Sequence, residues 1–439
     1  MAGVSCTSKN ELQADEGLDA MMAAIEEKLE LAKAGLERRN WDQNRYICRV
    51  PPDLIRDDSY YDANCRPQVI SVGPYHYGEP RLEAMQFYKY RMLHLVLEIS
   101  KTYMSTMVNV VKNLEREAHA CYEDLPRTKR FPSAVFVEML LLDGCFIIGH
   151  AYKCAKDKDL AFYKAYNNYA IWKDMLLLEN QIPLFVLTQL HGVIQANYWP
   201  YEEQLVDLLF RRLAAGWVIG RHPTSYEGEM PQLSSSLIQN IGGNVQSCIE
   251  ILWHNLMYDS TTKEYTEKME QTRRIDVLEP LVDLKQHAIP SATALTEAGV
   301  VLKHKTTTPF WDVVFNAGVL EIPQIFIYEA SELVFLNLMA FELCHVDEKK
   351  YKVTPYILFM DSLVNSATDV AQLRAHGIIV YKAGSDEEVA ALFNRLGKRA
   401  DICLNNPLLN QPTSNVLSKP VLEEKSMTDN LYADIGTPR

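Results

Sequence analysis

Two acid-bracketed apolar segments hold the carboxylates with which this chain could catalyse a hydrolysis. Glu138-Met-Leu-Leu-Leu-Asp143 and Asp174-Met-Leu-Leu-Leu-Glu179 share one pattern. Paired carboxylates can act as general acid and base when burial separates their pKa values. However, residues i and i+5 lie about 140° apart around a helix of 3.6 residues per turn, so the two acids of one segment face different directions. We therefore interpret these acids as the edges or capping partners of two similar core helices.

A histidine between two tyrosines is the second candidate for chemistry. His76 stands in the turn Gly73-Pro-Tyr-His-Tyr-Gly78, flanked by Tyr75 and Tyr77. Imidazole is the side chain that most readily exchanges a proton near neutral pH. No serine or cysteine nucleophile signature accompanies it, so we interpret His76 as a residue that hydrogen-bonds the turn. The alternative is a hydrolase-like enzyme that pairs His76 with Glu79 or with one of the core carboxylates.

Cys145, His150 and Cys154 offer soft donor atoms to a metal ion. His150 and Cys154 are four residues apart and would share one face of a helix. A structural zinc site normally has four ligands, and no fourth candidate stands nearby. The common phosphate-binding, dinucleotide-binding, serine-hydrolase and zinc-protease motifs are also missing from the chain. We therefore predict no catalytic residues, no cofactor and no metal site.

The composition is that of an ordinary folded protein with an acidic balance. The chain has 439 residues, of which 48% are apolar and 23% charged, and its net charge is −13. Proteins that bind the phosphate backbone need a basic surface, so this balance argues against a general nucleic-acid binder. The sequence therefore favours another protein as the partner and predicts no nucleic acid.

Cysteine usage and the apolar runs favour a cytosol-facing protein without a membrane helix. The nine cysteines are an odd number without a C-x-x-C pair, unlike a disulfide scaffold. The N-terminus has no apolar core behind a basic start, so we expect no signal peptide. A membrane span needs about 18 to 20 consecutive apolar residues. The most apolar windows, 134–148 and 175–190, are interrupted by charged or polar residues, and each is predicted to be a buried core helix.

The segment 15–40 has the spacing of an amphipathic helix. Its apolar residues recur at intervals of three and four, close to the 3.5-residue period of a coiled-coil seam. This helix could pack on its own domain, or it could present the seam to a partner, including a second copy of the chain. The interface candidates on it are Leu18, Met22, Ile25 and Leu29.

A Gly-, Ser- and Pro-rich stretch at 216–247 separates two groups of helical patterns. Such a stretch is typical of a loop or of a boundary between lobes. We therefore add Arg221 and Tyr226 of this stretch to the interface candidates. The turn residues Tyr75, His76 and Tyr77 complete that set.

Apolar periodicity predicts a mainly helical chain. Most of the periodic runs contain no glycine or proline, which favours helices. Ser385-Asp-Glu-Glu388 matches the capping box that begins a helix. The predicted helices are 81–98, 102–120, 133–155, 171–190, 201–215, 329–344, 351–365 and 386–396.

A small β region is predicted within 291–327. A strand at 299–303 precedes a hairpin whose arms are 311–315 and 319–322. Gly318 can take the left-handed position of the three-residue loop Asn316-Ala-Gly318. A further strand-like segment leads from Gln68 into the turn at 73–78.

These patterns together predict a mainly α (α+β) fold. It would be a multi-helix globular domain with a small antiparallel β hairpin or meander near 299–327. We expect an N-terminal amphipathic helix region at 1–45 and a helical domain at 46–398. The remainder, 399–439, is rich in Asn, Pro, Ser and Thr, and such a composition predicts a disordered tail.

Several segments, in order along the chain, are similar to those of a known plant family. The chain resembles the plant-specific family called domain of unknown function 247 over about residues 46–398. The first matching segment is Ile70-Ser-Val-Gly-Pro-Tyr-His-Tyr-Gly78. The longest is Asp174-Met-Leu-Leu-Leu-Glu-Asn-Gln-Ile-Pro-Leu-Phe185. The others are 139–148, 289–299, 318–323, 337–342 and 384–390.

The resemblance implies a land-plant protein with a largely helical domain and no established catalytic residues. Family members typically end in one membrane helix at the plasma membrane, and some grass members are linked to self-incompatibility as pollen-side determinants. In this chain, Arg395-Leu-Gly-Lys-Arg-Ala-Asp401 and a polar tail stand where the apolar anchor is expected. The resemblance therefore implies plasma-membrane association from the cytoplasmic side through a partner.

The sequence as a whole favours a non-enzymatic recognition or interaction protein, with pollen–stigma self-incompatibility signalling as its setting. The basis is a complete core pattern without a catalytic constellation, together with the family resemblance. Two alternatives stay open: the hydrolase-like enzyme centred on His76, and a general stress or signalling adaptor.

Overall fold

The computed structural model describes most of the chain from Ile47 to Asn405. The described residues are 47–55, 58–122, 131–156, 168–196, 204–215, 247–257, 275–276, 289–305, 310–346, 350–381 and 384–405. The chain divides between Arg45 and Tyr46, so all of these residues belong to one unit. The predicted helix at 15–40 with Leu18, Met22, Ile25 and Leu29, and the loop residues Arg221 and Tyr226, lie outside the described residues.

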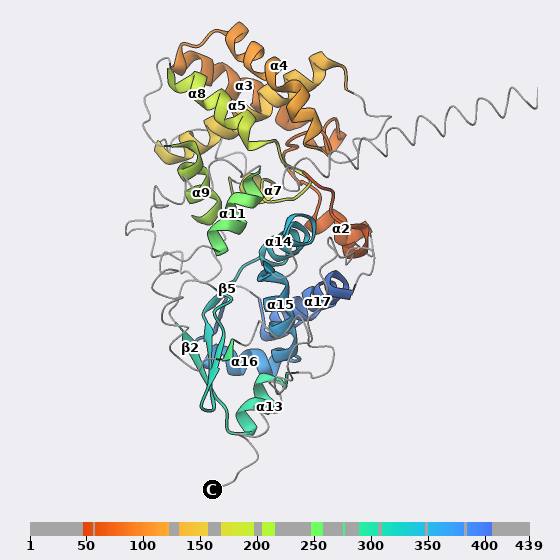
Figure 1. The fold of residues 1–439 in the computed structure, drawn as a ribbon, viewed down its shortest axis with the longest axis vertical. Helices are drawn as coiled ribbons and strands as arrows, with labels where there is room; N and C mark the ends of the chain where they lie inside the picture. Colours follow the sequence, from red (N-terminus) through yellow and green to blue (C-terminus); the bar gives the residue numbers. More distant parts are fainter. Residues whose placement is uncertain are drawn as a thin grey trace, which may run out of the picture. The chain divides into compact units, whose positions relative to one another are not determined.

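Helix α5 (Ser133–Lys156) is the centre of the N-terminal group of helices. It packs against α3 (Ala84–Ser100), α4 (Met104–Ala120), α8 (Leu184–Ala196) and α9 (Leu205–Ala215), as Figure 1 shows. Every residue from Met139 to Tyr152 is buried. A helix covered on all sides is expected to be apolar all round, and the one acid inside this buried run, Asp143, has polar partners.

By length and composition, α5 could also cross a membrane. The window Ser133–Tyr152 is sufficiently apolar, but 83% of it is buried inside the domain. Such extensive burial is typical of a core helix of a folded domain. This agrees with the prediction from the interrupting charged residues.

The C-terminal group consists of α14 (Ser331–His345), α15 (Val353–Leu363), α16 (Ala367–Ala375) and α17 (Asp386–Asn405). Helix α17 packs against the other three helices of the group. Glu342 of α14 is buried, and its carboxylate accepts the backbone N–H groups of Lys352, Val353 and Thr354 at 2.8–2.9 Å. These N–H groups lie at the start of α15, where a helix has no partners of its own for them.

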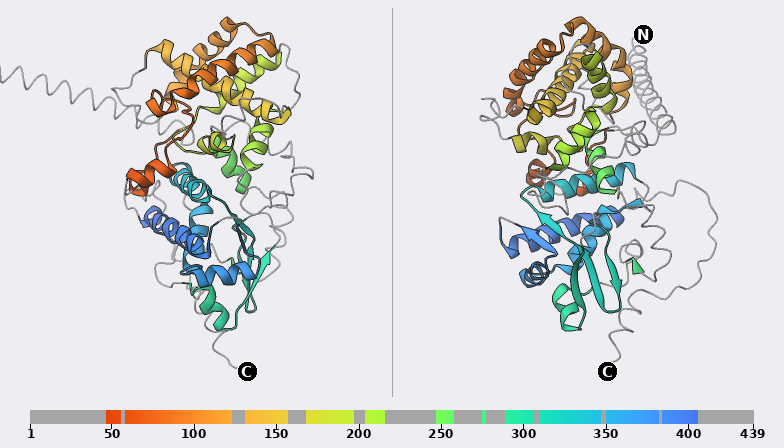
Figure 2. Two further views of the ribbon diagram at one scale, coloured as in Figure 1. Left: turned by 180° about the vertical axis from the view of Figure 1, so that it is seen from behind. Right: turned by 90° about the vertical axis from the view of Figure 1, so that its left-hand side faces the viewer.

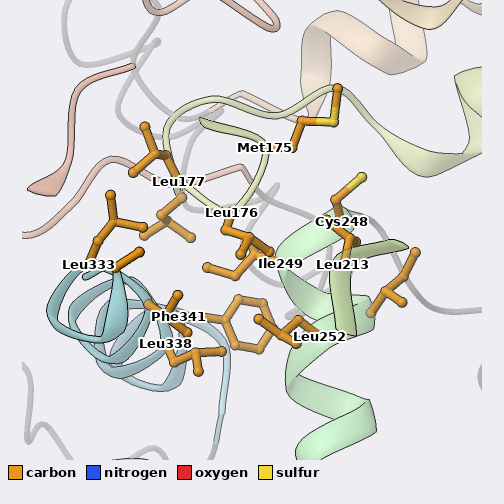
Figure 3. Packing of buried hydrophobic residues seen from close by; sticks show 14 of the residues in the cluster. Met175, Leu176, Leu177, Leu213, Cys248, Ile249, Leu252, Leu333, Leu338 and Phe341 are labelled. Atoms are coloured by element: carbon orange, nitrogen blue, oxygen red, sulfur yellow. The ribbon is translucent and has the colours of Figure 1, made fainter. Parts of the chain in front are cut away.

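A shared apolar core joins the two helical groups. Helix α11 (Cys248–Met257) contacts both α9 and α14, and α2 (Asp58–Asn64) contacts α14. Figure 3 shows leucines of the segment after α7 (Asn168–Asp174) packing against side chains of α11 and α14. Further short helices of the described residues are η1 (Pro52–Leu54), η2 (Pro80–Leu82) and α13 (Ala292–Glu297).

Two small sheets lie beside the C-terminal helices (Figure 2). The larger has the order β1-β3-β4-β2, with strands β1 (Ile275–Asp276), β2 (Val301–Lys305), β3 (Val314–Asn316) and β4 (Val319–Pro323). Strands β3 and β4 are antiparallel, whereas β2 runs parallel to β4 with Val301 opposite Val319. The second sheet pairs β5 (Ile325–Ile327) in parallel with β6 (Ile379–Tyr381).

The predicted fold class is confirmed: the described part of the chain is mainly helical with small sheets. The hairpin is also confirmed, but two details of the β region differ. The parallel pairings of β2 and β5 mean that the region is not a simple meander. The hairpin loop has two residues, because Asn316 pairs with Val319.

The prediction of one helix over 171–190 was wrong. The chain leaves the helical conformation after Asp174 and resumes it at Leu184. Pro183 has no N–H and disfavours a helical residue before it. Within the break, the Gln181 side-chain amide donates to the carbonyls of Met175 and Leu177, at 2.7 and 2.8 Å. Side-chain donors thus replace the missing helical N–H partners.

The predicted end of the last helix was also wrong. Helix α17 continues to Asn405, beyond the expected end at 396. Leu396 and Ala400 are buried and keep this part of the helix against its neighbours. By contrast, the capping box is confirmed, since Ser385 N donates to Glu388 Oε2 at 3.1 Å and Glu388 N to Ser385 Oγ at 3.3 Å.

We predict that Ala317→Asn stabilises the protein. Ala317 and Gly318 form the hairpin loop with φ values of 48° and 76°. A left-handed conformation is unfavourable for alanine and tolerated by asparagine, and Asn-Gly is the preferred pair in such two-residue loops. We expect the free energy of unfolding to rise by about 0.5–1 kcal/mol in urea denaturation.

The matched control is Ala298→Asn. Ala298 is also exposed but has a φ of −76°, so asparagine should relieve no strain there. A gain at Ala298 equal to the gain at Ala317 would contradict the assignment of the effect to the hairpin loop.

Candidate functional site

The backbone of residues 68–70 is bound by one buried carboxylate. Asp174, at the end of α7, accepts the N–H groups of Gln68, Val69 and Ile70 at 3.0, 2.7 and 2.9 Å. The strand-like segment that was predicted to begin at Gln68 is thus bound by side chains, and it belongs to neither sheet of the described residues. A buried N–H group needs a partner, and a side chain from more than 100 residues away supplies it.

Two further side chains continue this pattern along the segment. Asn180 accepts the N–H of Val72 at 2.6 Å and donates to the carbonyl of Ile70 at 2.9 Å. Asp143 of α5 accepts the N–H of Gly73 at 2.8 Å. Gly73 has a φ of 75°, and a Cβ atom there would lie 2.3 Å from the Gln181 carbonyl oxygen, so only glycine fits.

Glu179 binds residues that lie earlier in the chain. Its carboxylate accepts the Val50 N–H and the Tyr61 hydroxyl, each at 2.8 Å, and lies 3.5 Å from the Arg49 guanidinium. We call Asp143, Asp174, Glu179 and Asn180 the acceptor cluster. All four are buried, and together they hold the backbone of Val50 and of residues 68–73 against the core.

The acids of the two similar segments thus have different roles in the structure. Asp143, Asp174 and Glu179 are capping partners, as one of the two interpretations predicted, although for an irregular segment and not for a helix. Glu138 is exposed and accepts a hydrogen bond from the hydroxyl of Tyr90. Only the first segment is helical, so the expectation of two similar helices was wrong.

A buried lysine neutralises part of the acceptor cluster. Lys89 Nζ lies 2.5 Å from Asp143 Oδ1 and donates to the Ser71 carbonyl at 2.7 Å. Burial raises the pKa of Asp143 even though Lys89 opposes this. Lys89 was not predicted as a site residue, although its position on the apolar stripe of α3, between Met85 and Met92, marks it in the sequence.

His76 lies between two carboxylates in this region. Its Nδ1 atom is 2.8 Å from Glu79 Oε1, and its Nε2 atom is 3.7 Å from Glu179 Oε2. The structure therefore brings together His76 and both kinds of acid that the enzyme alternative named. The histidine is only 3% exposed, and burial lowers its pKa. His76 is therefore neutral at neutral pH and shielded from solvent.

The flanking tyrosines are also part of the packing. Tyr75 is buried and donates its hydroxyl to the Ile47 carbonyl at 2.8 Å, while the Arg49 guanidinium lies 4.4 Å from its ring centre. Tyr77 is partly buried and makes an edge-to-face contact with Phe131. Of the three turn residues selected as interface candidates, Tyr77 is the one that reaches the surface.

The predicted soft donors Cys145 and His150 are core residues. Both are fully buried, and burial raises the pKa of the Cys145 thiol to about 12. The His150 ring stacks on Phe146 and lies against Trp172. The side chain of Cys154 lies outside the described residues.

A different group of soft donors lies together in the structure. The ligand atoms of Cys48, Cys344 and His345 are all within 4.8 Å of one another. Sequence analysis missed this group because Cys48 and His345 are 297 residues apart. The only signal was the adjacent Cys344-His345 pair at the end of a predicted helix.

Comparisons with known proteins place this chain among plant proteins. A family model, DUF247, described as "Plant protein of unknown function", matches residues 47–419. The UPF0481 protein At3g47200 of Arabidopsis thaliana is 27% identical over 366 residues, which cover 80% of this chain and 72% of the relative. The putative UPF0481 protein At3g02645 of the same plant is 23% identical, over 80% of this chain and 78% of the relative. No solved structure matches significantly.

We predict that Asp174→Asn changes how stability depends on pH. Burial raises the pKa of folded Asp174 from 3.8 to about 6, so the folded chain holds this proton more tightly than the unfolded chain. The stability linked to this proton is complete below about pH 4 and is lost as pH rises to about 6. The wild type should therefore lose about 1–3 kcal/mol relative to Asp174→Asn across this window.

Urea denaturation at pH 4, 5, 6 and 7 measures this difference. Asp53→Asn is the control, because Asp53 is exposed and the wild-type profile should persist. If the stability of the wild type and of Asp174→Asn changed in parallel between pH 4 and pH 7, Asp174 would not be the group with the raised pKa.

Proposed function

This chain belongs to the DUF247 family of plant proteins of unknown function, and we propose that it is a non-enzymatic recognition or interaction protein that binds another protein. One observation carries the proposal. The described acids and the histidine that could do chemistry are used as hydrogen-bonding partners inside the fold, whereas large apolar side chains are exposed on helices. Such a division suits binding better than catalysis.

Three of the large apolar side chains that are exposed among the described residues lie at the start of α4. Tyr103, Met104 and Val108 are 79%, 45% and 36% exposed. Met104 and Val108 are four residues apart on one helix, so they share a face, and Tyr103 immediately precedes them. We call these three residues the α4 apolar surface. Clustered exposed apolar residues are typical of protein–protein contacts, whereas scattered single ones need no explanation.

The predicted helix at 15–40 would provide a second binding surface in this proposal. Its residues Leu18, Met22, Ile25 and Leu29 could contact the partner or join two copies of the chain. The setting that we propose is pollen–stigma self-incompatibility, at the cytoplasmic side of the plasma membrane, as the family resemblance implies. A general stress or signalling adaptor is the alternative setting, and the tissue in which the partner binds distinguishes the two.

We predict that changing the α4 apolar surface weakens partner binding. The variant Tyr103→Ser with Met104→Gln removes two exposed apolar side chains. Tyr103 is the N-cap residue of α4, and serine is a preferred N-cap, so the helix should persist. Truncation of a central contact typically costs more than about 1.4 kcal/mol, or about tenfold in affinity. Quantitative co-purification from plant tissue, followed by binding of the recovered protein, measures the loss.

Two further variants accompany this experiment. Val301→Thr removes an apolar side chain that is also exposed, on β2, and should keep wild-type binding. Deletion of residues 1–40 should lower partner recovery if the N-terminal helix contributes. Equal recovery with the wild type, the α4 variant and the deletion would contradict both proposed surfaces.

A hydrolase is the second candidate function, and the placement of His76 between Glu79 and Glu179 is the observation that favours it. A neutral imidazole beside two carboxylates has the polarity that a general base needs. Its burial argues the other way, because a substrate has no access to the ring in this conformation.

We predict that His76→Asn lowers stability and removes no activity. The substitution loses the 2.8 Å hydrogen bond between the buried His76 ring and Glu79, and a hydrogen bond to a charged group typically contributes about 1.5–3 kcal/mol to stability. Thermal unfolding measures the loss. His94→Asn is the control, since the His94 side chain is 79% exposed. If the wild type hydrolyses an ester, amide or phosphate substrate and folded His76→Asn does not, the enzyme alternative replaces our proposal.

A further inference from the structure

Cys48, Cys344 and His345 meet where the first described segment of the chain contacts the end of α14. Cys344 and His345 are the last two residues of α14, and Cys48 precedes η1. The distance from Cys48 Sγ to His345 Nε2 is 3.6 Å. The two sulfur atoms and one ring nitrogen of His345 all lie within 4.8 Å of one another. Both cysteines are free thiols.

We propose that these three side chains bind one zinc ion, with water as the fourth ligand. Two thiolates and an imidazole form a donor set that is typical of zinc sites. Cys48 is buried, whereas Cys344 and His345 are partly exposed, so water can reach the remaining position. The site is independent of the proposed partner binding and rests on different residues.

The spacing of the donors matches a tetrahedral ion. With zinc–sulfur and zinc–nitrogen bonds of about 2.3 and 2.05 Å, a tetrahedral site places sulfur and nitrogen about 3.6 Å apart. The observed distance between Cys48 Sγ and His345 Nε2 is 3.6 Å. Two sulfur ligands of one zinc ion lie about 3.8 Å apart, within the 4.8 Å limit observed. These distances are compatible with one ion bound by all three side chains.

The histidine ring is oriented for binding. His345 Nδ1 lies 3.2 Å from the Phe341 carbonyl oxygen, and the ring stacks on Phe341 with centres 4.6 Å apart. When Nδ1 carries the proton and donates to this carbonyl, Nε2 presents its lone pair toward Cys48. A hydrogen bond from the second ring nitrogen is the usual support of a metal-bound histidine.

The backbone around Cys48 is held on both sides. Ile47 N donates to the Cys121 carbonyl at 2.7 Å, and Val50 N donates to Glu179 of the acceptor cluster. Arg49 is the nearest cation in sequence, and its guanidinium is engaged with the Tyr75 ring and with Glu179. Fixed donors are what a metal site needs for affinity.

Zinc binding would release two protons. Each thiol loses its proton to solvent as its sulfur becomes a thiolate ligand, and neutral His345 binds without losing one. The two thiolates balance the charge of Zn²⁺. The ion would then join residue 48 to α14 and stabilise the folded chain, because the unfolded chain does not hold these three ligands together.

The experiment uses the full chain, purified with a phosphine reductant that keeps thiols reduced. Zinc is removed by chelation and added back, and bound metal is measured by elemental analysis. We expect about one more zinc ion per chain in the wild type than in Cys48→Ser, Cys344→Ser or His345→Gln. Zinc should also raise the Tm of the wild type by about 2 °C or more, and cobalt in its place should show sulfur-to-metal charge-transfer absorption.

Cys248→Ala is the matched control, since Cys248 is a buried thiol of α11, and it should keep wild-type zinc content and cobalt absorption. The cobalt signal shows whether sulfur binds the metal, even if one variant is too unstable for a thermal measurement. Equal zinc content in the wild type and the three variants would overturn the proposal. A disulfide between Cys48 and Cys344 without reductant, together with no zinc uptake when reduced, would overturn it as well.

Discussion

Buried N–H groups that neither a helix nor a sheet can pair are the main constraint on this fold. Leaving such a group without a partner costs about 1–3 kcal/mol. In the segment 68–73, side chains bind five N–H groups, and three of these hydrogen bonds are buried. Asp174, Asn180 and Asp143 are the acceptors. These side chains come from segments that pack in the core, so formation of the core and ordering of the segment depend on each other.

Carboxylates also bind backbone N–H groups at two places in the C-terminal group. Glu342 binds the three N–H groups at the start of α15. Asp369 of α16 accepts the N–H groups of Thr293, Asn365 and Ser366 at 2.9–3.2 Å. In each case one carboxylate orders backbone that is distant or irregular. Hydrogen bonds inside the fold therefore account for these buried acids of the described residues. In the function that we propose, surface side chains such as the α4 apolar surface bind the partner.

Local patterns predicted the elements, and long-range pairing could not be predicted. The apolar run of α5 and the capping box at Ser385 depend on residues a few positions apart, so the sequence was sufficient for both. The break after Asp174 was missed because apolar periodicity was given more weight than Pro183. Hydrogen bonds across more than 100 residues, and the approach of Cys48 to α14, leave no periodic signal in one sequence.

Amide hydrogen exchange of the segment 68–73 tests the role of the buried acids most directly. Mass spectrometry would follow a peptide that covers this segment in the wild type, Asp174→Asn and the control Asp53→Asn. The account predicts slow exchange in the wild type and the control, and exchange at least about tenfold faster in Asp174→Asn, with α5 unchanged. Equal protection of this segment in all three proteins would contradict the claim that the carboxylate holds it.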